Sequence, residues 1–72
     1  MTKDEITAVQ AHLRRLLGNQ RITLSVPQRK NASVELRVGD EFLGTVHRDE
    51  EDGEVSYAIQ MVVLAEDLSQ VN

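Results

Sequence analysis

Apolar residues near the start of the chain recur three or four positions apart, at Ile6, Val9, Leu13, Leu16 and Leu17. This spacing places them on one stripe of a helix. Thr2 and Glu5 have the spacing of a capping box, which marks a helix start. Gly18 supplies the left-handed residue that commonly follows a helix end. The pattern predicts a helix over residues 3–17.

Apolar and polar residues then alternate, as they do in a strand with one buried face. The apolar positions are Ile22, Leu24 and Val26 in the first run, and Val34, Leu36 and Val38 in the second. They predict strands at 21–26 and 33–38. Aligned as an antiparallel hairpin, Val26 faces Val34, Leu24 faces Leu36 and Ile22 faces Val38, so the two apolar rows coincide.

The second half of the chain predicts two more strands, at 42–48 and 54–64. A turn at Gly39-Asp40 precedes the first of them, and the acidic run 49–53 forms the hairpin tip between them. Gly44 marks a bulge or a close approach of two backbones. The tail, 65–72, either adds one helical turn through Leu68 or frays.

These elements predict a single α+β domain over residues 1–72, with an N-terminal helix packed on a four-stranded antiparallel meander sheet. We expect Leu13, Leu16, Leu24, Leu36 and Ile59 in its core.

One helix covers only one face of the sheet, whereas the third and fourth strands carry apolar residues on both faces. We therefore expect a candidate interface for a homodimer or a protein partner, formed by Phe42, Leu43, Val46, Met61, Val62, Val63 and Leu64. The alternative is a monomer whose tail folds back through Leu68 and Val71.

Composition narrows the class of protein. The 72 residues are 40% hydrophobic, include no cysteine and carry a net charge of -4. Disulfides, thiol catalysis and cysteine-based zinc sites are therefore excluded. The N-terminus lacks the basic flank and apolar run of a signal peptide, and no stretch is long enough to span a bilayer. We expect a cytoplasmic protein without membrane contact.

Charge is unevenly distributed along the chain. Seven of the eight basic residues precede Asp40, and nine of the twelve acidic residues lie from Asp40 onward. The basic half predicts a candidate phosphate or nucleic-acid surface, made of Arg14, Arg15, Arg21, Arg29, Lys30 and Arg37. The overall acidity and the near absence of aromatic residues for base stacking argue against this alternative.

Candidate catalytic and metal-binding residues are few. The acidic tip fails as an EF-hand loop, because Arg48 and Ile59 would occupy the first and last ligand positions. A weaker alternative is a divalent-metal site formed by His47, Asp49 and Glu51, whose spacing places them on one strand face. A solvated hairpin tip is the simpler interpretation. Ser56 lies near them, but no nucleophile motif surrounds it. We expect neither enzymatic activity nor a cofactor.

Three runs resemble a small alphaproteobacterial family classified only as a domain of unknown function. They are Val38 to Gly44, Arg48 to Tyr57, and Gln60-Met61, and the helix from Asp4 to Gly18 is similar as well. The loop from Pro27 to Ser33 matches least. The resemblance implies a short bacterial cytoplasmic protein that stands alone as one domain, and it brings no activity, cofactor or catalytic residue.

Overall fold

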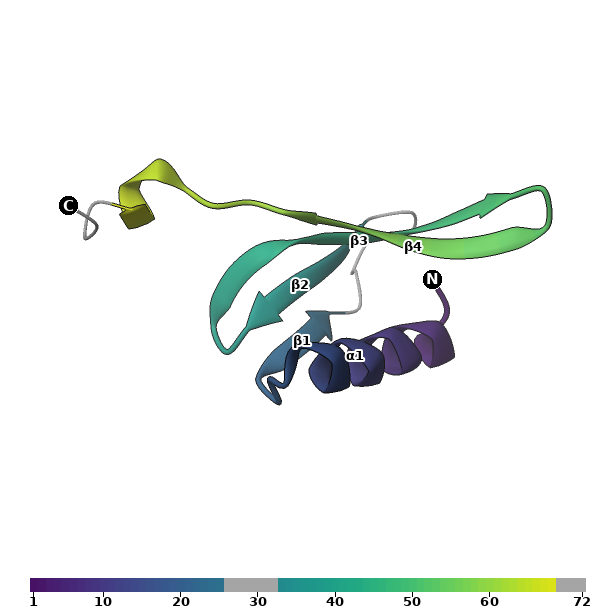
Figure 1. Ribbon diagram of the computed structural model, residues 1–72, viewed down its shortest axis with the longest axis horizontal. Helices are drawn as coiled ribbons and strands as arrows, with labels where there is room; N and C mark the ends of the chain where they lie inside the picture. The colour runs from purple at the N-terminus through teal and green to yellow at the C-terminus, as the bar shows by residue number, and fades with distance from the viewer. Residues whose placement is uncertain (26–32, 69–72) are drawn as a thin grey trace.

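The computed structural model describes residues 1–25 and 33–68. In this part of the chain one helix precedes a four-stranded antiparallel sheet (Figure 1). The elements are α1 (Lys3–Leu17), β1 (Ile22–Ser25), β2 (Val34–Val38), β3 (Glu41–Glu51), β4 (Glu54–Met61) and the 3-10 helix η1 (Ala65–Leu68). The strands are ordered β1-β2-β3-β4. The α+β class and the meander topology are confirmed.

Helix α1 begins and ends as predicted. The Thr2 hydroxyl oxygen accepts the backbone N–H of Glu5 at 3.1 Å, and Glu5 Oε1 accepts the backbone N–H of Thr2 at 2.8 Å. This reciprocal pair satisfies two donors at the helix start. Gly18 ends the helix with a φ of 62°, in the left-handed region that glycine adopts without a steric penalty.

The β1–β2 hairpin has the predicted register. Ile22 lies opposite Val38 and Leu24 opposite Leu36. Val26, expected opposite Val34, lies outside the described residues. Because residues directly opposite each other share one face, the apolar rows of the two strands coincide.

The β3–β4 hairpin is longer on the β3 side than the sequence predicted. Strand β3 continues to Glu51, three residues past the predicted end, and the turn is only Asp52-Gly53. These two residues have φ values of 54° and 81°, as the two-residue turns of hairpins require. The residues of the acidic run are exposed, so their charge does not interrupt the backbone pairing.

A β-bulge interrupts β3 close to Gly44. Leu36 pairs with Gly44 and Arg37 with Phe42, which leaves Leu43 as the extra residue. A Cβ on Gly44 would overlap the backbone carbonyl of Gln60 on β4. Both readings of this glycine, a bulge and a close backbone approach, are therefore confirmed.

Strand β4 ends at Met61, before the predicted end at residue 64. The Val62 N–H still donates to the Leu43 carbonyl at 2.7 Å. Because the bulge bends β3 at this point, the following residues find no partner strand among those described. The chain leaves the sheet there as a projecting arm, which within the described residues extends to η1 (Figure 1).

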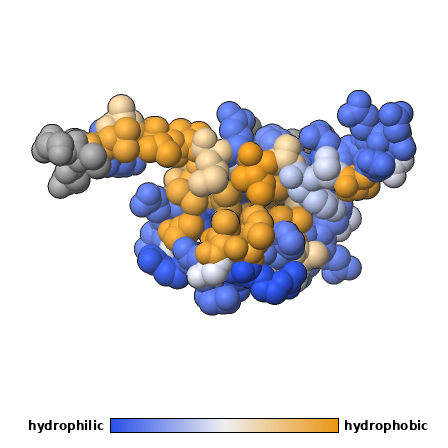
Figure 2. Space-filling view, in the orientation of Figure 1, coloured by the Kyte–Doolittle hydropathy of each residue, from blue (hydrophilic) through white to orange (hydrophobic). Residues whose placement is uncertain are grey.

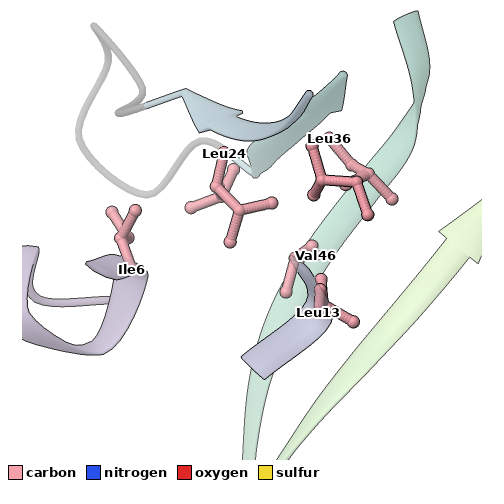
Figure 3. Close-up of a cluster of buried hydrophobic side chains, with 7 residues drawn as sticks. Ile6, Leu13, Leu24, Leu36 and Val46 are labelled. Atoms are coloured by element: carbon pink, nitrogen blue, oxygen red, sulfur yellow. The ribbon is translucent and has the colours of Figure 1, made fainter. Parts of the chain in front are cut away.

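The core lies between α1 and one face of β1, β2 and β3, where side chains from all four elements converge (Figure 3). Its buried residues are Ile6, Leu13, Ile22, Leu24, Val34, Leu36 and Val46. The prediction was correct for Leu13, Leu24 and Leu36. It was wrong for Leu16 and Ile59, which are 67% and 40% exposed.

The position of α1 explains these two errors. The helix packs against β1, at one edge of the sheet. The part of the helix-covered face that belongs to β4 is therefore left partly uncovered. Ile59 lies opposite Val46 on that face, one strand further from the helix. Leu16 follows Val9 by seven residues, about two helical turns, and so lies on the same flank of α1 as Val9, which lines a groove against Ile59 of β4.

The face of the sheet away from α1 is mainly polar. It carries Thr23, Glu35, Arg37, Thr45, Ser56, Ala58 and Gln60, according to the strand registers. Phe42 is a large apolar residue on this face, and the Arg37 guanidinium lies 5.8 Å from its ring centre. Leu68 is 53% exposed on the projecting arm. It does not cover this face, contrary to the folded-back alternative, and Val71 lies outside the described residues.

Candidate interaction surface

The two edges of the sheet differ in how their backbone groups are used. At β1, side chains of α1 reach the outer edge: the Leu24 N–H donates to Gln10 Oε1 at 3.0 Å, and Arg14 Nε donates to the Ile22 carbonyl at 2.8 Å. At β4, no described element pairs with the outer edge. An open strand edge is a template for pairing with another chain.

The short turn determines which β4 residues present their backbone groups outward. Glu51 and Glu54 flank the two-residue turn and form a hydrogen-bonded pair, and such pairs alternate along an antiparallel ladder. Ser56, Ala58 and Gln60 therefore bond to β3. The outward N–H and C=O groups belong to the alternate residues of β4, namely Val55, Tyr57, Ile59 and Met61.

The side chains of these same residues lie on the α1 side of the sheet. Val55 is 43% exposed and Met61 is 59% exposed. A groove of about 530 Å³ separates β4 from α1, and its lining includes Val9, Tyr57 and Ile59. The outer strand of the sheet thus combines apolar side chains with backbone groups that no described strand pairs.

Apolar surface continues from this groove into the arm. Val62, Val63 and Leu64 are between 45% and 69% exposed. Figure 2 shows apolar atoms gathered on the body of the molecule and along the arm. We use the term β4 surface for the exposed apolar set Leu16, Val55, Ile59, Met61, Val62, Val63 and Leu64.

A polar bridge spans one end of the groove. Glu5 Oε2 accepts hydrogen bonds from the Tyr57 hydroxyl at 2.6 Å and from Arg48 Nε at 2.8 Å. Arg48 also donates to Glu50 Oε1 at 3.1 Å. Glu5 belongs to α1, Arg48 to β3 and Tyr57 to β4, so this bridge joins the start of the helix to the two strands of the second hairpin.

The bridge shifts the pKa values of its members. The Thr2 backbone N–H, followed by the Tyr57 hydroxyl and Arg48, lowers the pKa of the Glu5 carboxyl from 4.5 to about 2. The hydrogen bond to Glu5 and partial burial raise the pKa of Tyr57. Hydrogen bonds to Glu50 and Glu5 raise the pKa of Arg48. At neutral pH the bridge is a carboxylate, a neutral phenol and a guanidinium, an arrangement suited to holding elements together.

The predicted interface residues do not form one surface. Val46 is 1% exposed and belongs to the core, and Leu43 packs against it. Phe42 lies on the opposite face, beside Arg37. Met61, Val62, Val63 and Leu64 remain exposed and contiguous. The prediction placed these groups together because the bulge at Leu43 and the lateral position of α1 are not visible in an alternating pattern.

Four residues of the predicted basic surface lie within the described part of the chain. Arg14 is bonded to the β1 edge, and Arg37 pairs with Glu35 at 3.0 Å on the polar face. The Arg21 guanidinium lies over Gly39, whereas Arg15 is exposed on α1. Arg29 and Lys30 lie outside the described residues.

Among the candidate catalytic and metal residues, Asp49 lies directly opposite Ser56, and His47 is two positions earlier on β3. The His47 ring nitrogens lie 3.3 Å from the hydroxyls of Ser33 and Thr45, on the exposed polar face. Within residues 1–25 and 33–68, no group of histidine and carboxylate side chains is arranged to hold a metal ion. In the same ranges, no helix has the length and apolar composition of a membrane span.

The Glu5, Arg48 and Tyr57 bridge was not predicted. The capping box had assigned Glu5 a local role, and its Oε1 does perform that role. Its second oxygen meets residues that follow 43 and 52 positions later. The unusual signal in the sequence was Tyr57, the single tyrosine of the chain, in a strand facing a helix that carries an acid.

Comparison with family models matches residues 5–67 to one family, described as Protein of unknown function (DUF3126). No curated protein and no solved structure matches the chain.

Proposed function

Because the chain belongs to this family, whose description assigns no function, we propose from its geometry that it is a small noncatalytic interaction module that associates with itself. The supporting observation is the β4 surface, in which exposed apolar side chains adjoin an open strand edge. Monomeric proteins rarely leave a large contiguous apolar patch uncovered. A twofold contact would bury the patch in both copies.

The proposed contact lies on the α1 side of the sheet. The far face of the sheet is mainly polar and gives a partner little apolar area to bury. The α1 side offers Leu16, Ile59 and Met61, each 40% exposed or more. The helix leaves this part free because it packs at the β1 side.

A noncatalytic role agrees with the chemistry of the described residues. Their strongest polar constellation, around Glu5, consists of groups that already satisfy one another. Its tyrosine has a raised pKa, which opposes use as a base or nucleophile at neutral pH. The absence of cysteine agrees with a bacterial cytoplasmic setting, which is also part of the proposal.

The mass of the chain across a dilution series tests self-association. Light scattering should give twice the chain mass at micromolar concentration. Ile59→Lys places a charge within the β4 surface and should return the mass to that of one chain. Thr23→Lys is the matched control, because Thr23 is an exposed residue on the polar face of β1. A single-chain mass for the parent protein at millimolar concentration would contradict the proposal.

A further inference from the structure

We propose that two copies pair antiparallel along their β4 strands, so that two four-stranded sheets join into one continuous sheet with Ala58 on the twofold axis. This inference rests on the self-association proposed above and specifies how it occurs. The partner is a second copy, because the edge and both faces of β4 are complementary to themselves in one register.

The first argument concerns backbone groups. The outward N–H and C=O groups of β4 belong to Val55, Tyr57, Ile59 and Met61. These positions are symmetric about Ala58. An antiparallel pair centred there sets Val55 opposite Met61 of the partner subunit, and Tyr57 opposite Ile59 of the partner subunit. Every outward group of the strand then has a partner, because directly opposite residues of this kind exchange both hydrogen bonds.

The second argument concerns the two faces of the joined sheet. On the α1 side, the opposed side chains of this register are the apolar pairs just named. On the far side, Ser56 lies opposite Gln60 of the partner subunit, and Ala58 opposite its own copy. Apolar residues therefore meet apolar residues, and polar residues meet polar ones. Cross-strand pairs matched in this way stabilise a sheet.

The third argument concerns charge and orientation. The tip of the β3–β4 hairpin carries Asp49, Glu50, Glu51, Asp52 and Glu54. A parallel arrangement of two β4 strands would bring both acidic tips together, and like charges in contact are repelled. The antiparallel arrangement places the tips at opposite ends of the joined sheet. The charges therefore select the orientation that the backbone register also requires.

Disulfide trapping tests the register, because the chain contains no cysteine of its own. Ala58 bonds to β3 within its own chain, so the two copies of Ala58 form a non-hydrogen-bonded pair with Cα atoms about 4.5 Å apart. That separation lies within the range of a disulfide, about 4.4–6.8 Å. Ser56→Cys is the matched control on the same exposed face, since two copies of residue 56 would lie about 13 Å apart along the strands.

Under mild oxidation, most of the Ala58→Cys chain should migrate as a linked dimer on a non-reducing gel, and only a trace of the Ser56→Cys chain. Equal linkage of the two variants would overturn the proposed register. So would linkage of neither variant in samples that light scattering shows to be dimeric. In both cases self-association itself would stand, whereas a single-chain mass of the parent protein would remove both proposals.

Ile59→Pro gives a second check that needs no cysteine. It removes an outward N–H and leaves the hydrogen bonds between β4 and β3 in place, and proline is tolerated at such edge positions. The expected result is a single-chain mass with an unchanged far-UV circular dichroism spectrum. A variant that stays dimeric and folded would contradict pairing through this edge.

Discussion

Glu5 is the residue at which the start of α1 is held to the rest of the molecule. One carboxylate oxygen closes the capping box, and the other binds Tyr57 and Arg48. Among the described residues, these are the side-chain hydrogen bonds that join α1 to β3 and β4. A single side chain therefore couples a local feature, the helix cap, to the placement of the helix over the sheet.

The lowered pKa of Glu5, about 2, makes stability depend on pH. The folded state favours the carboxylate, so the contribution is complete above the usual pKa of 4.5 and is lost as pH falls from 4.5 toward 2. Glu5→Gln should lower the urea midpoint of unfolding at pH 7. It should also make stability depend less on pH below 4.5. Glu54→Gln, at the exposed hairpin end, is the control. If the urea midpoints of Glu5→Gln and of the parent chain fell equally as the pH is lowered, this role of Glu5 would be contradicted.

The two leucines Leu13 and Leu16 should respond differently to truncation. Leu13 is 7% exposed and Leu16 is 67% exposed. We expect Leu13→Ala to lower the unfolding free energy by about 2–5 kcal/mol. At dilutions where the chains are separate, Leu16→Ala should change it by no more than about 0.5 kcal/mol from that of the parent chain. Chemical denaturation measures both. Equal losses would place both leucines in the core.

At the scale of elements, the local rules in the sequence were sufficient for α1 and for the first hairpin. Thr2, Glu5 and Gly18 fix the ends of the helix, and the alternation around Leu24 and Leu36 fixes the register. Each rule acts between residues close in sequence or directly opposite in a hairpin. The lateral position of α1 depends on its contacts with β1, and the sequence pattern does not contain it.

The contact between α1 and the edge of β1 gives a prediction at this scale. Gln10→Ala leaves the Leu24 N–H without its acceptor and should destabilise the edge by about 1 kcal/mol. Amide hydrogen exchange at Leu24 should be faster in this variant. Gln20→Ala, an exposed position after the helix, is the control. Unchanged exchange at Leu24 would show that the glutamine does not protect the edge.

At the scale of the whole molecule, two arginines of the predicted basic surface already have hydrogen-bond partners among the described residues. Arg14 and Arg37 are engaged on different parts of the sheet. We expect nucleic-acid binding to be undetectable in gel shifts at physiological salt, and weak binding at low salt to vanish as salt is added. Sequence-selective binding at submicromolar concentration would contradict this.

The sequence predicted only part of the candidate surface. Met61 to Leu64 were identified because their apolar run exceeds what one buried face needs. Val46 was misassigned because a period of two gives two faces but does not say which one α1 covers. The bridge between Glu5 and Tyr57 depends on a contact across 52 positions, beyond the reach of any local pattern.

The unequal edges of the sheet limit how this fold can grow. Gln10 and Arg14 occupy two backbone groups of the β1 edge, whereas no described element pairs with the outer edge of β4. Polymerisation into a fibril requires two complementary ends, whereas a unit with one reactive end terminates after a single addition. In the proposed pairing, the helix therefore limits strand addition to a single step, because its side chains occupy the β1 edge. In the proposed pairing, the association of exposed apolar strands therefore stops at two chains.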